Sequence, residues 1–360
     1  MKVTVKKEEL LKSLKKVQGI SEKRTTMPIL NNILIESKEK IIIKATNLDN
    51  SIISKCEGEI HEVGSICLPS KKFFEIVKNL PSDNIAITKE EKNILIKSGK
   101  TSFRLFFQPS EDFPAIKVPS DNKKNIIDRA EFIKALNKVE YAIYPDESRL
   151  SLNGVYIHKL ENKIRFVSSD SYRLCYYEFP FSDEIENMLI SKKAVAEIIK
   201  VFSTEKDEKI SISTSDNFAA FEVEDTVFIT RLREVKFPNY TEVIPYNNPY
   251  KSYIDKNNIL ESLHRLLVIA EESTKGVLFS FKQELISIKG ANIELGEGED
   301  EIDHIYEGES MDIGFNAQYL IEAVSNIEAE KIEIALKDSA KAVLISGDEN
   351  YKAVVMPVKI

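Results

Sequence analysis

The sequence SSDSYRLCYY at residues 168–177 decides the fold, because it marks a repeated unit. It begins with small polar residues, as in a tight turn, and continues with alternating apolar and aromatic residues, as in a half-buried strand. Two similar stretches, ATNLD at 45–49 and GANIE at 290–294, also follow isoleucine-rich strands. Corresponding points therefore recur at intervals of about 120 residues, which predicts three copies of one domain.

Each copy contains the same order of predicted elements. Apolar residues at helical spacing predict two amphipathic helices per copy, and alternating strands follow each helix. The helices are expected at 7–18 and 70–80, at 128–142 and 191–202, and at 255–270 and 316–327. Matching positions in the strands are occupied by Lys44, Val167 and Lys289.

This order indicates an α+β protein made of three repeated domains, each with two helices packed on antiparallel sheet. The domains are expected at 1–119, 124–243 and 245–360. A free sheet edge exposes unpaired backbone groups, so we expect the domains to join edge to edge. Two such chains would then close a ring if their ends met head to tail.

The composition is that of an ordinary globular protein, with 42% apolar and 30% charged residues. No apolar run reaches the ~18 residues that a membrane span needs, and the N-terminus lacks the apolar region of a signal peptide. We therefore expect a cytoplasmic protein. Cys56, Cys67 and Cys175 show no CxxC spacing and are expected to be buried and free.

The net charge of −8 is unevenly distributed along the chain. Residues 1–120 carry 21 Lys and Arg against 15 Asp and Glu, whereas residues 245–360 carry 11 against 21. A basic first domain facing an acidic third domain would favour head-to-tail over like-end pairing. The residues expected at these ends are Lys97, Lys100 and Arg104 on one side, and Glu297, Glu299, Asp300 and Glu301 on the other.

Motifs of catalysis are incomplete in this sequence. The GKT at 99–101 lacks the earlier glycine of a phosphate-binding loop, and the GEG at 296–298 lies among acidic residues that would repel a dinucleotide. The four histidines are scattered singly, so neither a metal nor another cofactor is expected. Asp170 is interpreted as a turn-capping residue rather than a catalytic acid.

With three repeats established, several motifs become informative together. They are TTMPILNNILI at 25–35, LPSKKFFEIVKNLP at 68–81, FRLFFQPSEDFP at 103–114, LNG at 152–154, SDSYRL at 169–174, FPNY at 237–240, GFNAQYL at 314–320 and VVMPVKI at 354–360. In this order and spacing, the whole chain resembles the bacterial DNA polymerase III beta subunit family, the sliding clamps.

The resemblance implies a homodimeric head-to-tail ring with helices lining a hole through which duplex DNA passes. Basic residues on the helix faces would neutralise phosphates without reading bases, although such residues can also simply solvate a helix. The residues predicted to face DNA are Lys12, Arg24, Lys71, Lys72, Arg149, Lys192 and Lys193. Of these, Arg24, Lys192 and Lys193 match the DNA-facing positions of the family. Lys15, Lys16, Lys134, Lys138 and Lys200 lie on similar predicted faces.

The resemblance also implies a pocket between the middle and last domains that takes a short, extended peptide from partner proteins. Aliphatic and Met side chains would receive Leu or Phe anchors, and Arg173 and Ser169 would fix polar groups. The pocket residues carried over are Leu152, Ser169, Ser171, Tyr172, Arg173, Leu174, Pro238, Val243, Tyr319, Ala340, Ala342, Val354, Met356, Pro357, Val358 and Lys359.

At the junction between subunits, the resemblance adds apolar residues to the charges already described. The full expected set is Lys100, Phe103, Arg104 and Leu105 of the first domain, and Val268, Ile269, Glu297, Glu299, Asp300 and Glu301 of the third. Apolar contacts would hold the junction and the charges would orient it.

The expected function is that of a processivity factor with no catalytic activity of its own and no cofactor. Its expected partners are duplex DNA without sequence specificity, the replicative polymerase, the clamp loader, translesion polymerases and repair proteins. Two alternatives remain at this point, a nucleic-acid-modifying hydrolase or transferase and a three-domain scaffold without a DNA role. The missing acid–base or metal constellation argues against the enzyme.

Overall fold

Every helix in the repeat is preceded directly by a short strand of four to six residues. The computed structural model describes residues 1–21, 27–119, 124–215 and 217–359. In these ranges, no helix has both the length and the apolar character that crossing a membrane requires. The six predicted helices are confirmed, but the short strands before them were missed because so few residues establish no clear period.

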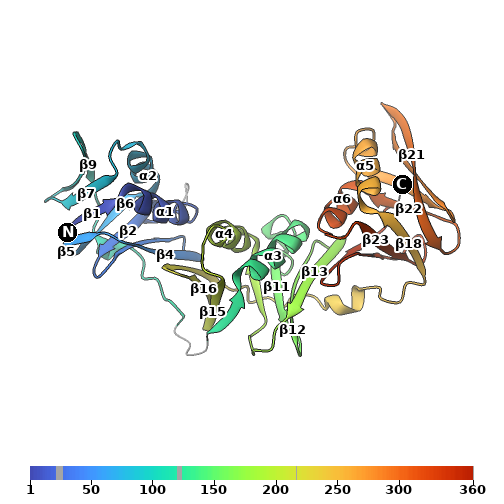
Figure 1. Cartoon of the computed structure of the whole chain (residues 1–360), viewed down its shortest axis with the longest axis horizontal. Helices are drawn as coiled ribbons and strands as arrows, with labels where there is room; N and C mark the ends of the chain where they lie inside the picture. The colour runs from blue at the N-terminus through green and yellow to red at the C-terminus, as the bar shows by residue number, and fades with distance from the viewer. Residues whose placement is uncertain (22–26, 120–123, 216, 360) are drawn as a thin grey trace. The chain divides into compact units, whose positions relative to one another are not determined.

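The three copies share one order of elements, except that the first has an additional strand, β5, and they are coloured along the chain in Figure 1. The first contains β1 (Lys2–Lys6), α1 (Lys7–Val17), β2 (Asn32–Ser37), β3 (Ile41–Thr46), β4 (Asn50–Cys56), β5 (Glu59–Glu62), β6 (Gly64–Pro69), α2 (Ser70–Asn79), β7 (Asn84–Lys89), β8 (Asn93–Ser98) and β9 (Thr101–Phe106). The second contains β10 (Asn125–Asp128), α3 (Arg129–Val139), β11 (Gly154–Lys159), β12 (Lys163–Ser169), β13 (Arg173–Pro180), β14 (Met188–Ser191), α4 (Lys192–Phe202), β15 (Lys209–Ser215), β16 (Phe218–Val223) and β17 (Thr226–Arg231).

The third copy contains β18 (Tyr250–Asp255), α5 (Lys256–Leu267), β19 (Gly276–Phe281), β20 (Leu285–Asn292), β21 (Gly296–Glu307), β22 (Met311–Asn316), α6 (Ala317–Ser325), β23 (Lys331–Leu336), β24 (Val343–Ser346) and β25 (Tyr351–Val355). Short 3₁₀ turns at Pro28–Asn31, Ser110–Asp112, Glu140–Ala142, Glu147–Arg149 and Tyr240–Val243 lie in the connections. Within the first copy α1 packs on α2, and within the third α5 packs on α6 (Figure 1).

The chain divides into two compact units, one of residues 1–133 and 193–232, the other of 134–192 and 233–360. The first unit holds a five-stranded sheet, β5-β1-β7-β8-β9, and an eight-stranded sheet, β10-β15-β16-β17-β4-β3-β2-β6. The second holds a twelve-stranded sheet, β14-β11-β12-β13-β25-β24-β23-β18-β21-β20-β19-β22. Each unit therefore combines one terminal copy with part of the central copy.

The copies are joined by antiparallel strand pairing, as the edge-to-edge prediction required. In the first unit β17 pairs with β4, and Val227 lies opposite Ile53. In the second unit β25 pairs with β13, and Lys352 lies opposite Tyr176. In both cases the last strand of one copy satisfies the backbone groups of the edge strand of the preceding copy's sheet.

The hydrophobic core of each copy lies between its helices and its sheet. Leu10, Leu14 and Val17 of α1 are almost completely buried, as is Phe73 of α2. Leu11, the other leucine in the first half of α1, is only half-buried and lies beside a surface groove. The cysteines at positions 56, 67 and 175 are buried and free, which confirms their predicted structural role.

In all three copies, the turn that marked the repeat has a side-chain oxygen that accepts the N–H of the residue three positions further on. Asn47 Oδ1 accepts the N–H of Asn50, and Asn292 Oδ1 accepts those of Glu294 and Leu295. In the middle copy, Asp170 Oδ1 accepts the N–H groups of residues 172 and 173, both at 3.0 Å. The turn-capping interpretation of Asp170 is therefore confirmed.

A buried histidine in the third copy makes its stability depend on pH. The His304 ring lies 2.5 Å from the carbonyl oxygen of Lys282 through Nε2 and 2.8 Å from the Ser252 hydroxyl through Nδ1. Since a carbonyl can only accept, Nε2 carries the proton and Nδ1 accepts from Ser252. Burial lowers the pKa of His304, so the folded protein favours the neutral ring.

Above pH ~6.5, the ordinary histidine pKa, we expect proton binding by His304 to leave the free energy of unfolding unchanged. It should decrease as the pH falls toward the lowered folded pKa, because the unfolded chain then binds the extra proton. Urea denaturation between pH 7.5 and 5 measures this decrease. His304→Gln should make this decrease smaller, because the glutamine side chain does not titrate; a decrease of unchanged size in this variant would contradict the assignment.

Candidate functional site

A cavity of about 210 Å³ opens in the second unit beside the turn between β12 and β13. Its walls come from that turn, from the LNG segment before β11, from the connection leading to β18 and from the end of β25. Ten of the sixteen predicted pocket residues line it: Leu152, Ser169, Ser171, Tyr172, Arg173, Leu174, Pro238, Val243, Val354 and Met356. The structure thus brings together residues that are up to about 200 positions apart in the sequence.

Phe237, Asn239 and Tyr240 also line this pocket and were missed. The Phe237 ring stacks on Tyr156, with centroids 5.1 Å apart and planes 7° apart. Tyr240 is hydrogen-bonded through its hydroxyl to His158 Nδ1 at 2.7 Å. The two aromatic residues of the FPNY segment were the available signal, because large rings beside a proline turn commonly anchor a connection to a core.

The Arg173 guanidinium is occupied by groups of the same chain. Its Nε donates to Asp170 Oδ2 at 2.9 Å, its Nη2 donates to the Tyr141 carbonyl at 3.0 Å, and its Nη1 pairs with Glu322. Its Cζ atom also lies 4.3 Å from the Tyr319 ring centroid. Burial acts to lower the pKa of Arg173, but the hydrogen bond to Glu322 and the nearby carboxylates raise it overall.

This arrangement differs from the expected role of Arg173 as a donor to ligand groups. Ser169 is likewise engaged, since its hydroxyl donates to the carbonyl of residue 173 at 2.8 Å and accepts the N–H of Ser171 at 3.2 Å. Both residues therefore stabilise the turn through contacts within the chain. The pocket offers a ligand mainly apolar walls, together with the exposed Tyr172 and Met356 side chains.

The remaining predicted pocket residues lie around the cavity rather than in its lining. Tyr319 contacts the Arg173 guanidinium, and Ala342 packs against the apolar cluster beneath the pocket. Ala340 lies in a turn capped by Asp338, and Pro357 follows Met356 at the surface. Val358 and Lys359 line a different cavity of about 650 Å³, beside the turn between β20 and β21.

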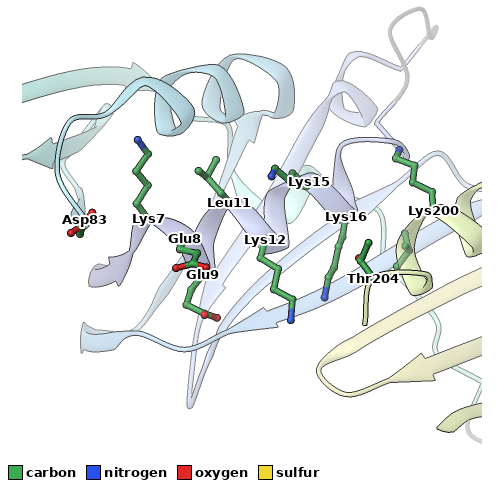
Figure 2. Close-up of a pocket in the computed structure, with 11 residues that line it drawn as sticks. Lys7, Glu8, Glu9, Leu11, Lys12, Lys15, Lys16, Asp83, Lys200 and Thr204 are labelled. Carbon is green, nitrogen blue, oxygen red and sulfur yellow. The ribbon is translucent and has the colours of Figure 1, made fainter. Parts of the chain in front are cut away.

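A second surface feature is a groove of about 700 Å³ along α1 in the first unit. It contains five lysines, at positions 7, 12, 15, 16 and 200. Figure 2 shows that Lys12 and Lys16 point to one side of α1, whereas Lys7 and Lys15 point to the other. Lys12 lies 3.5 Å from the buried carboxylate of Glu205, and Lys16 pairs with the same carboxylate.

The other residues expected to face DNA differ in their surroundings. Lys71 and Lys72 are exposed in the first turn of α2, and Lys72 lies 3.8 Å from Glu75. Lys192 and Lys193 begin α4, while Arg24 lies outside the described residues. In the second unit, Lys134 and Lys138 are both paired with Glu328, which makes them ion-pair partners rather than free cations.

The residues expected at the subunit junction lie on two strands and one helix end. Phe103, Arg104 and Leu105 belong to β9, the last strand of the five-stranded sheet, and Lys100 is in the turn before it. Glu297, Glu299, Asp300 and Glu301 belong to β21, and Val268 and Ile269 follow α5. The β21 strand was not predicted, because its glycines and charges conceal the alternation of a strand.

Comparison with known proteins gives a match along the chain. Models of the DNA polymerase III beta subunit match its N-terminal domain at residues 1–117, its central domain at 126–239 and its C-terminal domain at 241–359. The chain belongs to the DNA polymerase III beta subunit family. The three repeated copies are the three clamp domains of that family.

Individual relatives are similar over their whole length. The beta sliding clamp of Caulobacter vibrioides is 29% identical over 373 aligned residues, covering 100% of both chains. A solved clamp from Bartonella birtlesii bound to griselimycin has a TM-score of 0.96 at 28% identity, and covers 100% of both chains. A C. crescentus clamp with PEG bound to its putative beta-motif tethering region has a TM-score of 0.96 at 29% identity and the same coverage.

Membership of this family determines the general function. The chain is a sliding clamp, a processivity factor in DNA replication, and it has no catalytic activity of its own. Terms such as DNA-directed DNA polymerase and nucleotidyltransferase describe the complete polymerase to which the family belongs. The enzyme and scaffold alternatives are therefore excluded.

The internal ion pairs of Arg173 lead to a testable expectation about stability. Arg173→Ala should lower the free energy of unfolding by about 3 kcal/mol, because it leaves the Asp170 and Glu322 carboxylates without their cation. Lys209→Ala is the matched control, since the exposed Lys209 ammonium lies 3.9 Å from the half-exposed Asp128 carboxylate. Urea denaturation monitored by circular dichroism measures both; equal effects would contradict the structural role of Arg173.

Proposed function

We propose that two copies of this chain form a head-to-tail ring around duplex DNA and hold partner proteins through the pocket beside β13. The full-length family match, together with the pocket at the join between the second and third copies, carries the proposal. The domain boundaries at 119, 124, 243 and 245 and a cytoplasmic location are part of it. The ranges of the three family models support these boundaries.

Duplex DNA would be held by charge alone, without reading of the base sequence. The proposed contacts are Lys12, Arg24, Lys71, Lys72, Arg149, Lys192 and Lys193. The groove in Figure 2 adds Lys15, which is exposed and has no acidic partner among the described residues. A few lysine contacts screened by salt suit a protein that must move along DNA, because tight contacts would retard sliding.

The pocket beside β13 would receive a short peptide from the replicative polymerase, the clamp loader, translesion polymerases or repair proteins. Leu152, Leu174 and Val354 are buried in one apolar cluster that forms the base of the cavity. Such a base suits apolar anchor residues, which gain affinity by leaving water. The occupied polar groups of Arg173 and Ser169 leave recognition to shape, backbone contacts and the exposed rim.

The junction between subunits can be derived from the two joins inside the chain. Ser102, Val227 and Lys352 occupy equivalent positions in the last strands of the three copies. Each lies opposite the equivalent residue of the strand that precedes it in its own copy. Glu299, Ile53 and Tyr176 are equivalent in the same way. They lie opposite Lys289, Lys44 and Val167, respectively, which are the matching strand positions of the repeat. If the register of the internal joins also holds between subunits, Ser102 of one chain pairs with Glu299 of the second chain.

This register places Arg104 opposite Glu297 and Phe103 opposite Gly298. A Cβ placed on Gly298 would lie 3.3 Å from the Ile269 side chain. Phe103, opposite Gly298 on the same face of the sheet, would therefore contact Ile269. In both internal joins, the residue that follows the last paired residue of the strand donates its N–H to a carbonyl of the preceding copy's turn. Arg231 donates to the Asp49 carbonyl, and Met356 donates to the Tyr172 carbonyl. The equivalent donor would be Phe106, and the equivalent acceptor the Leu295 carbonyl.

The topological link to DNA can be tested directly. Purified protein should remain on nicked circular DNA after treatment with clamp loader and ATP, because a closed ring cannot leave a circle. Cutting the circle with a restriction enzyme should release it, as measured by gel filtration of the DNA-bound fraction. Retention on the linear product would indicate ordinary binding and would contradict the ring.

The junction register can be tested by crosslinking between copies. Arg104→Cys combined with Glu297→Cys should give covalent dimers with a short bis-maleimide, because directly opposite side chains share one face of the sheet. Arg104→Cys combined with Gly298→Cys is the control, since a shift of one residue reverses the face. The native cysteines are buried. Equal crosslinking of both pairs, measured on denaturing gels, would exclude this register.

A further inference from the structure

The segment from Tyr144 to Asn153 connects a proposed DNA contact with the peptide pocket. Arg149 belongs to the proposed DNA surface, and Leu152 lines the pocket. Both lie in the second unit, in the connection between α3 and β11. The inference that follows rests on the proposed function, because it concerns how these two surfaces affect one another.

The backbone of Arg149 determines where Leu152 lies. The Arg149 carbonyl accepts the N–H of Leu152 and that of Asn153, both at 3.0 Å. The Leu152 carbonyl in turn accepts the N–H of Tyr144 at 3.1 Å, and the Asn153 side chain donates to the Tyr144 carbonyl at 2.9 Å. Movement of Arg149 would therefore displace a residue at the base of the pocket.

The side chain of Arg149 holds the opposite rim of the pocket. Its Nη1 donates to the Ser171 hydroxyl at 3.0 Å, and its guanidinium lies 5.3 Å from the Tyr144 ring centroid. Ser171 has a φ of 81°, a left-handed conformation that is unfavourable for a residue with a Cβ. The bond from Arg149 stabilises this turn in the conformation that exposes Tyr172 at the pocket.

The guanidinium retains donors for a second partner. An arginine side chain has five N–H groups, and the contact with Ser171 uses one. Arg149 is exposed, and in the described part of the chain its side chain makes no ion pair with an acidic residue. A phosphate binds an arginine through two parallel N–H groups, so it can occupy the free edge while the bond to Ser171 remains.

We propose that Arg149 is a positioning residue that couples DNA to the peptide pocket, so that a DNA phosphate on its free edge tightens peptide binding. The phosphate immobilises the guanidinium, which fixes both Leu152 and the Ser171 turn before the peptide arrives. Because coupling between two binding events is reciprocal, bound peptide raises the affinity for DNA by the same factor. Partner proteins would then bind preferentially to clamps that already surround DNA.

The test measures peptide affinity with and without DNA. A fluorescein-labelled peptide containing the clamp-binding segment of the organism's replicative polymerase is titrated with the dimer at fixed salt, alone and with a saturating linear duplex. For the unmodified protein, DNA should lower the peptide Kd about fivefold, a typical size for such coupling. An unchanged Kd would overturn the inference.

Two variants separate coupling from simple support of the pocket. Ser171→Gly removes the hydroxyl but accepts the positive φ, so it should retain DNA affinity while the ratio of the two peptide Kd values falls to one. Arg149→Lys keeps the charge but loses the paired donors, and should lose the ratio as well. If Ser171 only supported the pocket, both Kd values would rise together and the ratio would persist, which would overturn the inference.

Lys15→Ala is the matched control, because it removes a proposed DNA contact in the first unit without touching this segment. It should weaken DNA binding and leave the fivefold ratio unchanged at saturating DNA. Loss of the ratio in this variant would overturn the role of Arg149. Failure of the unmodified protein to bind the peptide under either condition would instead contradict the pocket assignment in the proposed function.

Discussion

Antiparallel pairing between the last strand of one copy and the edge strand of the preceding copy's sheet is the interaction on which the rest of the structure depends. The pairing of β17 with β4 and that of β25 with β13 satisfy two sheet edges inside the chain. The same pairing brings Val354 and Met356 beside the turn before β13, which creates the pocket. One repeated contact thus produces continuous sheets and a binding site together.

Much of the fold could be predicted from sequence because it repeats. Each copy supplied an independent example of the helices and central strands, so periodicity in one region supported the interpretation of another. The strands before the helices were missed because they are short, and β21 was missed because glycine and acidic residues interrupt its alternation. The strand order could not be predicted, since pairing across copies depends on backbone groups that every residue possesses.

The sequence could group the residues of the candidate site but could not show their contacts. Ten of the residues assigned to the pocket line one cavity. Arg173 was expected to fix polar groups of a ligand, but within the chain its partners are Asp170, Glu322 and Tyr141. Lysines on helix faces raised the same difficulty. Lys138 looks solvated in its own helix, but Glu328, far along the chain, lies 3.2 Å away. Such partners are invisible to local patterns because only the folded chain brings them together.

The turn that follows β3, β12 and β20 shows what repetition permits over evolutionary time. Three copies of the turn keep the same side-chain cap, from Asn47, Asp170 and Asn292. A chain with one such turn would have to preserve fold and recognition in the same residues. Duplication removes that conflict: two copies can conserve the architecture while the third accumulates changes that attract partners, so new interactions arise without a new fold.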